Sequence, residues 1–221
     1  MTRAIAVLRP EPGNAATAVR VEAAGLTAIR LPLFVVHAVK WTVPDPARFD
    51  ALVLTSANAP RLAGARLDAL ADLPVFAVGP ATAAAAEVRG LTVAATGDGD
   101  GADLAATLAA RGFSRALLLA GRDRRLQAGG VIAEAVAVYA SDPVPVDAAA
   151  IEALAGSVAL LHSARAAQRF AELAGPVRAT IRLATISRAV ADAAGPGWEQ
   201  VAAADTPDDA ALVALARRLA D

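Results

Sequence analysis

The chain has 221 residues, a formal net charge of −1 and no cysteine, and 56% of its residues are hydrophobic, 19% charged and 4% aromatic. This length fits one large domain or two small ones and is sufficient for a hydrophobic core. The lack of cysteine excludes a disulfide scaffold, a thiolate metal centre and a thiol nucleophile, and the apolar, nearly uncharged composition excludes a disordered chain.

Short apolar runs alternate with longer alanine-rich stretches along almost the whole chain. This alternation is typical of β–α–β units, in which parallel strands form a sheet that helices cover on both faces. The first run is too short for the apolar region of an export signal, and nowhere do the ~18 consecutive apolar residues of a membrane span occur. We therefore expect a cytoplasmic α/β protein. Ten strands are predicted, at Ile5–Leu8, Thr27–Leu31, Ala51–Thr55, Val75–Val78, Leu91–Ala94, Ala116–Leu119, Val136–Tyr139, Val158–Leu161, Arg182–Ile186 and Gln200–Ala202.

Two proline-bearing stretches without helical periodicity, Pro32–Pro46 and Ser141–Pro145, interrupt this alternation. Ten strands are too many for one short sheet, so we interpret both stretches as crossings between two bodies. The expected fold is α/β, with two similar domains of parallel sheets flanked by helices, joined by a two-segment linker. One domain is discontinuous and contains both chain ends, residues 1–34 and 143–221, and the other is inserted between them, residues 35–142.

Internal similarity favours two related halves. In each half a strand ends in serine and leads into a helix, and a second strand and a further helix follow in the same order. Chance similarity between alanine-rich segments is the alternative explanation. The corresponding segments are Ala51–Ala57 with Val158–Ala164, Ala77–Ala83 with Ala184–Ala191, and Asp103–Leu108 with Ala211–Leu215.

Ligands of open α/β sheets bind beyond the carboxyl ends of the strands, where helix N-termini present N–H groups and a partial positive charge. In both predicted domains these positions hold small, hydroxyl-bearing or arginine residues. Each hydroxyl or amide side chain there has an alternative role as a helix N-cap. Together they predict a donor-rich rim for a polyanionic small molecule. The candidate substrate-binding residues are Arg9, Ser56, Asn58, Gly79, Ala81, Thr82, Arg122, Ser163, Arg165, Ser187 and Arg188.

Other kinds of site find little support. Lys40 is the only lysine among 21 basic residues, and these are scattered among 22 acidic ones, so no basic stripe for nucleic acid is expected. No glycine-rich dinucleotide or P-loop motif follows a strand. The nearest segment, Gly97–Gly101, carries aspartates and is interpreted as an acidic turn before a helix. The only histidines, His37 and His162, lie far apart in the sequence, so no metal site is expected.

Tyr139 is the only tyrosine and ends a predicted strand. It is either an ordinary strand aromatic residue or a phenolic acid at the ligand site.

The same residues carry a resemblance to a known family. The motifs are Arg9–Pro12, Leu54–Ala59, Phe76–Ala83, Val138–Tyr139 and His162–Ala164 followed by Phe170. In their order and spacing, over the full length of the chain, they resemble the uroporphyrinogen-III synthase family.

The resemblance implies a bilobed, cofactor-independent lyase. Members of this family close the linear tetrapyrrole hydroxymethylbilane into uroporphyrinogen III and invert ring D, through an azafulvenium and a spiro intermediate. Because the substrate carries its own reactivity, the enzyme's task is chiefly to position it. The expected partners are this small molecule and, transiently, the preceding deaminase, with the chain itself a monomer.

The resemblance also implies roles for individual residues. Tyr139 matches a tyrosine that assists departure of the substrate hydroxyl, while Ser56, Thr82 and Ser163 match polar residues that line the substrate. Backbone N–H groups near Gly79 and Ala81 are expected to bind carboxylates. The chain departs from the family where Ala189 and Val190 replace threonines, and there Ser187 or Arg188 is the expected substitute.

Two further interpretations stay open. Two α/β lobes joined by two crossings also describe a non-catalytic module that binds or senses a polycarboxylate. A degenerate synthase that binds its product without forming it is the other possibility.

Overall fold

The computed structural model describes residues 2–97, 101–124 and 126–221. The acidic turn expected at 97–101 falls mainly on residues 98–100, outside this description. None of the helices in the described ranges combines the length and the apolar character needed to cross a membrane.

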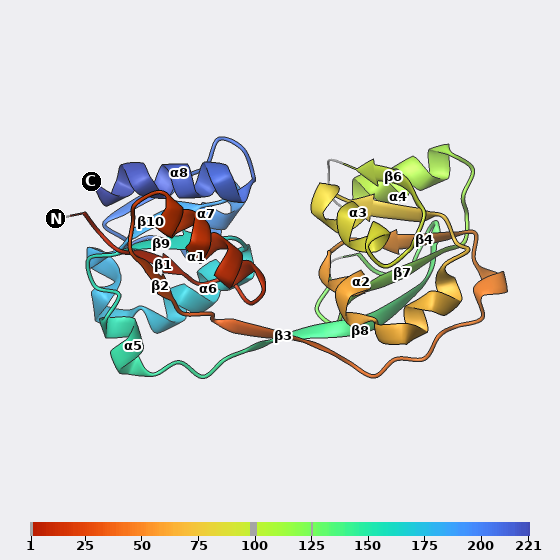
Figure 1. Ribbon diagram of the computed structural model, residues 1–221, viewed down its shortest axis with the longest axis horizontal. Helices are drawn as coiled ribbons and strands as arrows, with labels where there is room; N and C mark the ends of the chain where they lie inside the picture. Colours follow the sequence, from red (N-terminus) through yellow and green to blue (C-terminus); the bar gives the residue numbers. More distant parts are fainter. Residues whose placement is uncertain (1, 98–100, 125) are drawn as a thin grey trace. The chain divides into compact units, whose positions relative to one another are not determined.

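Strands and helices alternate along the chain (Figure 1). The strands are β1 (Ile5–Val7), β2 (Ala28–Arg30), β3 (Phe34–Ala38), β4 (Ala51–Leu54), β5 (Val75–Val78), β6 (Val93–Gly97), β7 (Ala116–Gly121), β8 (Ile132–Pro143), β9 (Val158–Leu161), β10 (Arg182–Thr185) and β11 (Gln200–Ala203). The α-helices are α1 (Gly13–Ala23), α2 (Asn58–Leu62), α3 (Pro80–Glu87), α4 (Gly101–Ala110), α5 (Ala148–Glu152), α6 (Ala164–Leu173), α7 (Arg188–Ala194) and α8 (Asp209–Ala220). Short 3₁₀ helices are η1 (Pro46–Arg48), η2 (Gly64–Leu70) and η3 (Gly175–Thr180).

The chain divides into two compact units. Unit 1 comprises Met1–Val35 and Asp142–Asp221, and unit 2 comprises Val36–Ser141. The chain therefore leaves unit 1 within β3 and returns within β8.

The two linking segments are more regular than the sequence predicted. All ten predicted strands are present, but β3 was missed, and β8 extends well beyond the predicted Val136–Tyr139. The prolines Pro32 and Pro44 flank the β-branched run of β3 and do not fall inside it, so the run is free to pair. Val39 N–H donates to Val138 C=O and Val144 N–H to Leu33 C=O, which makes β3 and β8 antiparallel.

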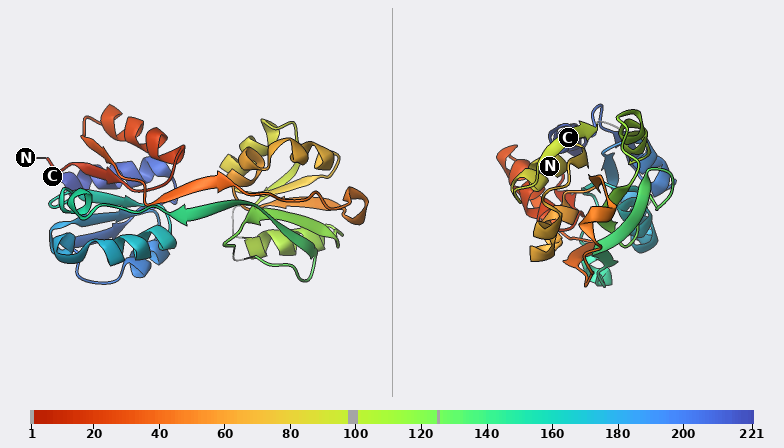
Figure 2. Two further views of the ribbon diagram at one scale, coloured as in Figure 1. Left: turned by 90° about the horizontal axis from the view of Figure 1, so that it is seen from below. Right: turned by 90° about the vertical axis from the view of Figure 1, so that its right-hand side faces the viewer.

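Unit 1 contains a sheet of order β11-β10-β9-β1-β2 with all strands parallel. One face packs against α5, α6 and α7 through residues such as Phe170, and the other packs against α1 and α8 through residues such as Leu215. Figure 2 shows these helices on both sides of the sheet. Because both faces are covered, the central strands consist of buried apolar residues without alternation.

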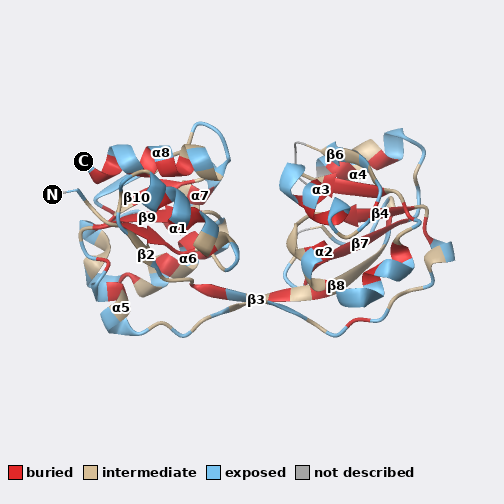
Figure 3. Ribbon diagram, viewed as in Figure 1, coloured by how far each residue is buried: buried red, intermediate tan, exposed pale blue. Residues whose placement is uncertain are grey.

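Unit 2 contains a sheet of order β3-β8-β7-β4-β5-β6, parallel from β8 to β6. Its faces are covered by α2, η2 and α3 on one side and by α4 on the other. In both units the burial colouring of Figure 3 marks the central strands as buried and the outer helix surfaces as exposed.

The two sheets share one plan. The order β2-β1-β9-β10-β11 in unit 1 corresponds to β8-β7-β4-β5-β6 in unit 2. The similar sequence segments occupy corresponding places, since β4 matches β9, β5 matches β10 and α4 matches α8. The strands β7 and β8, which come last along the chain in unit 2, correspond in unit 1 to β1 and β2, which the N-terminal segment of the chain supplies.

Phe170→Ala tests the packing of unit 1. Phe170 is fully buried and stacks on Trp198 with 5.2 Å between ring centroids. Its loss is expected to lower the free energy of unfolding by about 3–5 kcal/mol, measured by urea denaturation followed by tryptophan fluorescence. Val19→Ala, at a position 63% exposed on α1 of the same unit, is the control and should change it by less than about 0.5 kcal/mol. Equal losses of unfolding free energy in the two variants would contradict the placement of Phe170 in the core of unit 1.

Candidate functional site

The candidate residues gather, within each unit, beyond the carboxyl ends of neighbouring parallel strands. In unit 1, Arg9 follows β1, Ser163 and Arg165 follow β9, and Ser187 and Arg188 follow β10, three strands that lie side by side. In unit 2 the remaining candidates follow β4, β5 and β7 or lie in β8, again on adjacent strands.

Asp209 organises this edge of unit 1. It is the first residue of α8, and its side chain is only 15% exposed. One carboxylate oxygen accepts a hydrogen bond from Thr17 Oγ1 at 2.8 Å, lies 2.7 Å from His162 Nε2 and lies 3.3 Å from Arg9 Nη1. The other accepts from Arg20 Nη1 at 2.5 Å. Residues distant in the chain are thus joined at one carboxylate.

The protonation states in this cluster follow from burial and charge. Burial alone would raise the pKa of Asp209, but the hydrogen bonds from His162 and Thr17 and the charge of Arg9 hold it well below its usual value. Burial lowers the pKa of His162, outweighing its hydrogen bond to Asp209, and the charge of Arg9 lowers it further. His162 is therefore neutral near pH 7, with Nε2–H donating to Asp209 and a buried Nδ1 without a hydrogen-bond partner.

The loop after β1 holds Arg9 in place. The side-chain amide of Asn14, fully buried, donates to Val7 C=O at 2.7 Å and to Arg9 C=O at 3.0 Å. A Cβ on Gly13 would lie 2.4 Å from Arg9 Nε. The guanidinium therefore packs directly on the backbone of Gly13, in space that any other residue would fill. Arg9 also contacts Thr17 at 3.3 Å. The Arg9 guanidinium, predicted to bind a ligand, is thus engaged by side chains of its own unit.

The other unit 1 candidates have distinct surroundings. Ser163 is the N-cap of α6, and its Oγ accepts from Ala166 N–H at 3.2 Å. The guanidinium of Arg165 lies over the ring of Phe34, 4.7 Å from its centroid. Ser187 is the N-cap residue of α7, without a side-chain capping bond, and its C=O accepts from Thr185 Oγ1.

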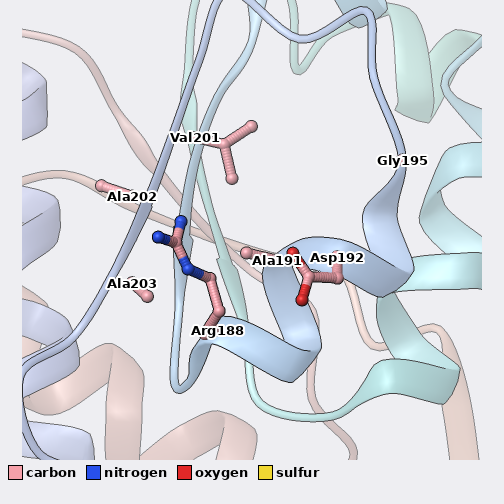
Figure 4. A pocket seen from close by; sticks show the side chains of 7 residues that line it. All are labelled: Arg188, Ala191, Asp192, Gly195, Val201, Ala202 and Ala203. Atoms are coloured by element: carbon pink, nitrogen blue, oxygen red, sulfur yellow. The ribbon is translucent and has the colours of Figure 1, made fainter.

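Arg188 begins α7 and lines a cavity of about 280 Å³. Figure 4 shows its guanidinium and the Asp192 carboxylate on α7, beside Val201–Ala203 of the edge strand β11. Of the two residues expected to stand in place of family threonines, Val190 is buried in the core of unit 1, where an apolar side chain packs.

In unit 2, Ser56 Oγ accepts from the N–H of Asn58, the first residue of α2, at 3.2 Å. Gly79 precedes α3 with φ 75°, a conformation that favours glycine, and its N–H already donates to Gly97 C=O at 2.9 Å. Ala81 and Thr82 lie in the first turn of α3, where Thr82 is 5% exposed.

The last two candidates lie on β8 and after β7. Arg122 follows β7, and its N–H donates to Tyr139 C=O at 2.8 Å. Tyr139 lies in β8 opposite Gly121, partly buried against the core beneath α2 and α3. Within the described part of the chain, no hydrogen bond is made by the phenol oxygen.

Sequence reasoning missed the cluster around Asp209. From the sequence, His162 is interpreted only as a possible metal ligand and as part of a family motif, and Thr17 and Asp209 are not considered. The available signal was the pair Asp208–Asp209 at the start of the last helix, which is typical of an N-cap and a first-turn acid. Among the described residues, no group of three or more histidine or acidic side chains could hold a metal ion.

The state of His162 predicts a pH dependence of stability. Because its pKa is lowered in the folded chain, the unfolded chain takes up the proton first, so stability is complete above about pH 6.5 and falls as the pH drops through the window below it. Urea denaturation at about pH 7.5 and about pH 5.5 measures this loss. His162→Gln should reduce the difference, whereas His37→Gln, at an exposed position, should preserve it. An unchanged difference in His162→Gln would contradict the assignment.

Asp209→Asn keeps the shape of the side chain and removes its charge. It leaves Arg9 and Arg20 without their shared carboxylate, so we expect a loss of about 2 kcal/mol in the free energy of unfolding. Asp205→Asn, an exposed position in the preceding loop, is the control and should have little effect. Similar losses in the two variants would exclude a special role for Asp209.

Solved structures share this fold. A uroporphyrinogen-III synthetase from Helicobacter pylori 26695 is 17% identical with a TM-score of 0.66, and the match covers 98% of this chain and 99% of that chain. A mutant uroporphyrinogen III synthase from the extremely thermophilic bacterium Thermus thermophilus is 17% identical with a TM-score of 0.55, covering 97% and 98%. At this identity the likeness establishes the two-unit α/β fold. A search of curated proteins finds no match.

The sequence pattern of one family matches nearly the whole chain. Its description is "Uroporphyrinogen-III synthase HemD", and the matched residues are 15–214, which include segments of both units and most of the candidate site. The chain belongs to the uroporphyrinogen-III synthase family.

Proposed function

We propose that the chain cyclises hydroxymethylbilane to uroporphyrinogen III, with inversion of ring D and release of one water. The observation that carries this proposal is the family match over residues 15–214. It also favours an enzyme over a non-catalytic binding module.

The carboxyl edges of both sheets supply groups suited to a substrate with eight carboxylates. Arginine pairs with carboxylates in a bidentate manner, and the open first turns of helices add N–H donors. Arg188 and Arg165 each line a cavity, of about 280 Å³ and about 240 Å³. Arg188 is the better placed for this task, because the guanidinium of Arg165 lies over Phe34 and that of Arg9 pairs with Asp209. Arg122, exposed beside β7, would serve the same purpose in unit 2.

Tyr139 is proposed as the acid. As the C–O bond of the hydroxymethyl group breaks, the pyrrole nitrogen supplies the electron pair that forms the azafulvenium, and the phenol donates its proton to the departing hydroxyl, which leaves as water. The substituted carbon of ring D attacks to form the spiro intermediate. The bond from that carbon to the bridge from ring C then breaks, which leaves a second azafulvenium on ring C. The unsubstituted carbon of ring D attacks this azafulvenium and loses its proton, which closes the macrocycle with ring D inverted. The proton lost when the macrocycle is completed restores the phenol, so protons balance over the cycle.

Positioning accounts for most of the remaining catalysis. Uncatalysed closure joins the unsubstituted carbon of ring D and gives the uninverted isomer. A protein that holds the carboxylates so that the substituted carbon meets the azafulvenium changes the product without a further reactive group. Ser56, Thr82 and Ser163 contribute to this binding surface in the proposal.

The proposal also includes a cytoplasmic monomer that needs no metal or organic cofactor and meets the preceding deaminase transiently. Size-exclusion chromatography tests the monomer, and activity after chelator treatment tests the independence of metal. A pull-down with the deaminase, with and without substrate, tests the transient contact.

The decisive experiment supplies freshly generated hydroxymethylbilane to the purified chain, oxidises the products and separates uroporphyrin I from uroporphyrin III by chromatography. Predominance of isomer III, with only isomer I in the absence of protein, is the expected result. Isomer I alone from folded protein would overturn the proposed reaction.

Tyr139→Phe removes the proton donor and keeps the ring. We expect kcat to fall about 100-fold, as for loss of a positioned general acid, with the thermal unfolding temperature nearly unchanged. Steady-state formation of isomer III measures kcat. Unchanged turnover would leave Tyr139 a packing residue.

Arg188→Ala tests carboxylate binding in unit 1. We expect KM to rise about 10-fold, the equivalent of one charged hydrogen-bonded contact, with kcat within about twofold of the parent. Arg217→Ala removes the same charge from the exposed side of α8 and should leave both parameters unchanged. Equal losses in kcat and kcat/KM for Arg188→Ala would contradict a role in binding alone.

A further inference from the structure

The ring of Tyr139 lies directly against the backbone of Gly121, the last residue of β7. A methyl group at position 121 would lie 2.8 Å from Cζ, 2.9 Å from Cε2 and 3.1 Å from the phenol oxygen of Tyr139. The first two distances are below 3.0 Å, a separation that real Cβ atoms essentially never show. Any side chain at position 121 would therefore move the ring, and the hydroxyl with it.

This requirement for glycine is purely steric. Gly121 is not in the left-handed region, unlike many other glycines of the chain. Its backbone dihedral angles are ones that any residue can adopt. Alanine would therefore fit at position 121 if the ring of Tyr139 were not there. Glycine is therefore required at position 121 to make room for the ring of Tyr139, and not to allow an unusual backbone conformation.

A β-bulge brings Tyr139 to this place. The register between β7 and β8 pairs Leu119 with Val136 and Ala120 with Ala137, and then pairs Gly121 with Tyr139, passing over Val138. In a regular pairing Val138 would lie opposite Gly121, and Tyr139 would point to the other face of the sheet. The extra residue keeps Tyr139 opposite the glycine.

The packing agrees with this register. Val136, Val138 and Tyr139 all contact the same core cluster, beneath α2 and α3, although Val138 and Tyr139 are consecutive. Two consecutive side chains on one face are what a bulge produces and what strict alternation forbids. Arg122 N–H, which donates to Tyr139 C=O at 2.8 Å, fixes the backbone of β8 just beyond the bulge.

We propose that Gly121 is a positioning residue, which together with the bulge at Val138 sets the location of the Tyr139 hydroxyl. This inference rests on the proposed function for its catalytic meaning, because it assigns to Gly121 the placement of the proposed acid. The placement itself is a property of unit 2 that can be measured without substrate.

The first experiment uses the fact that Tyr139 is the only tyrosine. Incorporation of 3-fluorotyrosine gives a single ¹⁹F resonance, which Gly121→Ala is expected to shift. Gly101→Ala is the matched control, because its added methyl meets Leu126 and Thr55 at 3.3–3.5 Å and should leave the resonance in place. An unshifted resonance in Gly121→Ala would overturn the inference.

A stability cycle tests the same contact independently. Gly121→Ala should lower the thermal unfolding temperature by about 5 °C in the parent, as expected for overpacking, and by much less when Tyr139→Leu has removed the ring. Equal decreases of the unfolding temperature in the parent and in Tyr139→Leu would show that the added methyl group does not act through the ring, and would overturn the inferred contact.

The kinetic experiment separates positioning from mere packing. In Gly121→Ala, kcat for isomer III should fall about 100-fold with KM little changed, because a displacement of about 1 Å is enough. The double variant with Tyr139→Phe should be no slower than Tyr139→Phe alone. Full kcat in Gly121→Ala, with Tyr139→Phe impaired and the resonance shifted, would overturn the positioning role.

Failure of the proposed function gives a different pattern. If Tyr139→Phe retains full turnover, the acid role fails, while the ¹⁹F and stability results still decide whether Gly121 places the ring.

Discussion

Burial of both faces of each sheet is the constraint on which the rest of this structure depends. The central strands are apolar without alternation, since helices cover them on either side. Polar side chains that could bind a ligand are therefore largely absent from the sheet faces. They lie at the ends of the strands, where the helices begin. Parallel strands bring all their carboxyl ends to one edge, so residues that are far apart in the chain meet there. Arg9 and Asp209, 200 positions apart, meet in this way.

The carboxyl edges of the two sheets offer different groups for the proposed binding of anions. In unit 1 the edge is ionic, with Asp209 joining side chains of α1, the loop after β1 and the residue after β9. The carboxylate of Asp209 is compensated by two arginines, so the cluster as a whole stays positive while His162 is neutral, as the proposed binding of carboxylates requires. In unit 2 the edge relies on the backbone around Gly79, the hydroxyl of Ser56 and the phenol of Tyr139. In the proposed function, unit 1 attracts carboxylates by charge and unit 2 supplies the proton donor.

Much of the fold was predictable because its signals are local. The apolar runs give the strands, and serine at their ends gives helix starts, as Ser163 illustrates by capping α6. The strand β3 was missed because prolines stand on both sides of it, and only pairing with β8 makes the run a strand. The Asp209 cluster could not be predicted either, since it depends on β1 lying beside β9. Single residues of the candidate set were predicted from position alone, but their partners, such as Phe34 beneath Arg165, are set by tertiary packing.

The orientation of Tyr139 shows where a strand pattern stops being informative. Alternation along β8 assigns Val136, Val138 and Ala140 to one face and would send Tyr139 to the other. The bulge reverses that assignment, and the ring has room on this face because Gly121, on the neighbouring strand, has no Cβ. A glycine at the end of β7 and an aromatic residue on β8 are unremarkable apart. They become informative only through the register, in which the extra residue of β8 places Tyr139 opposite the glycine of β7.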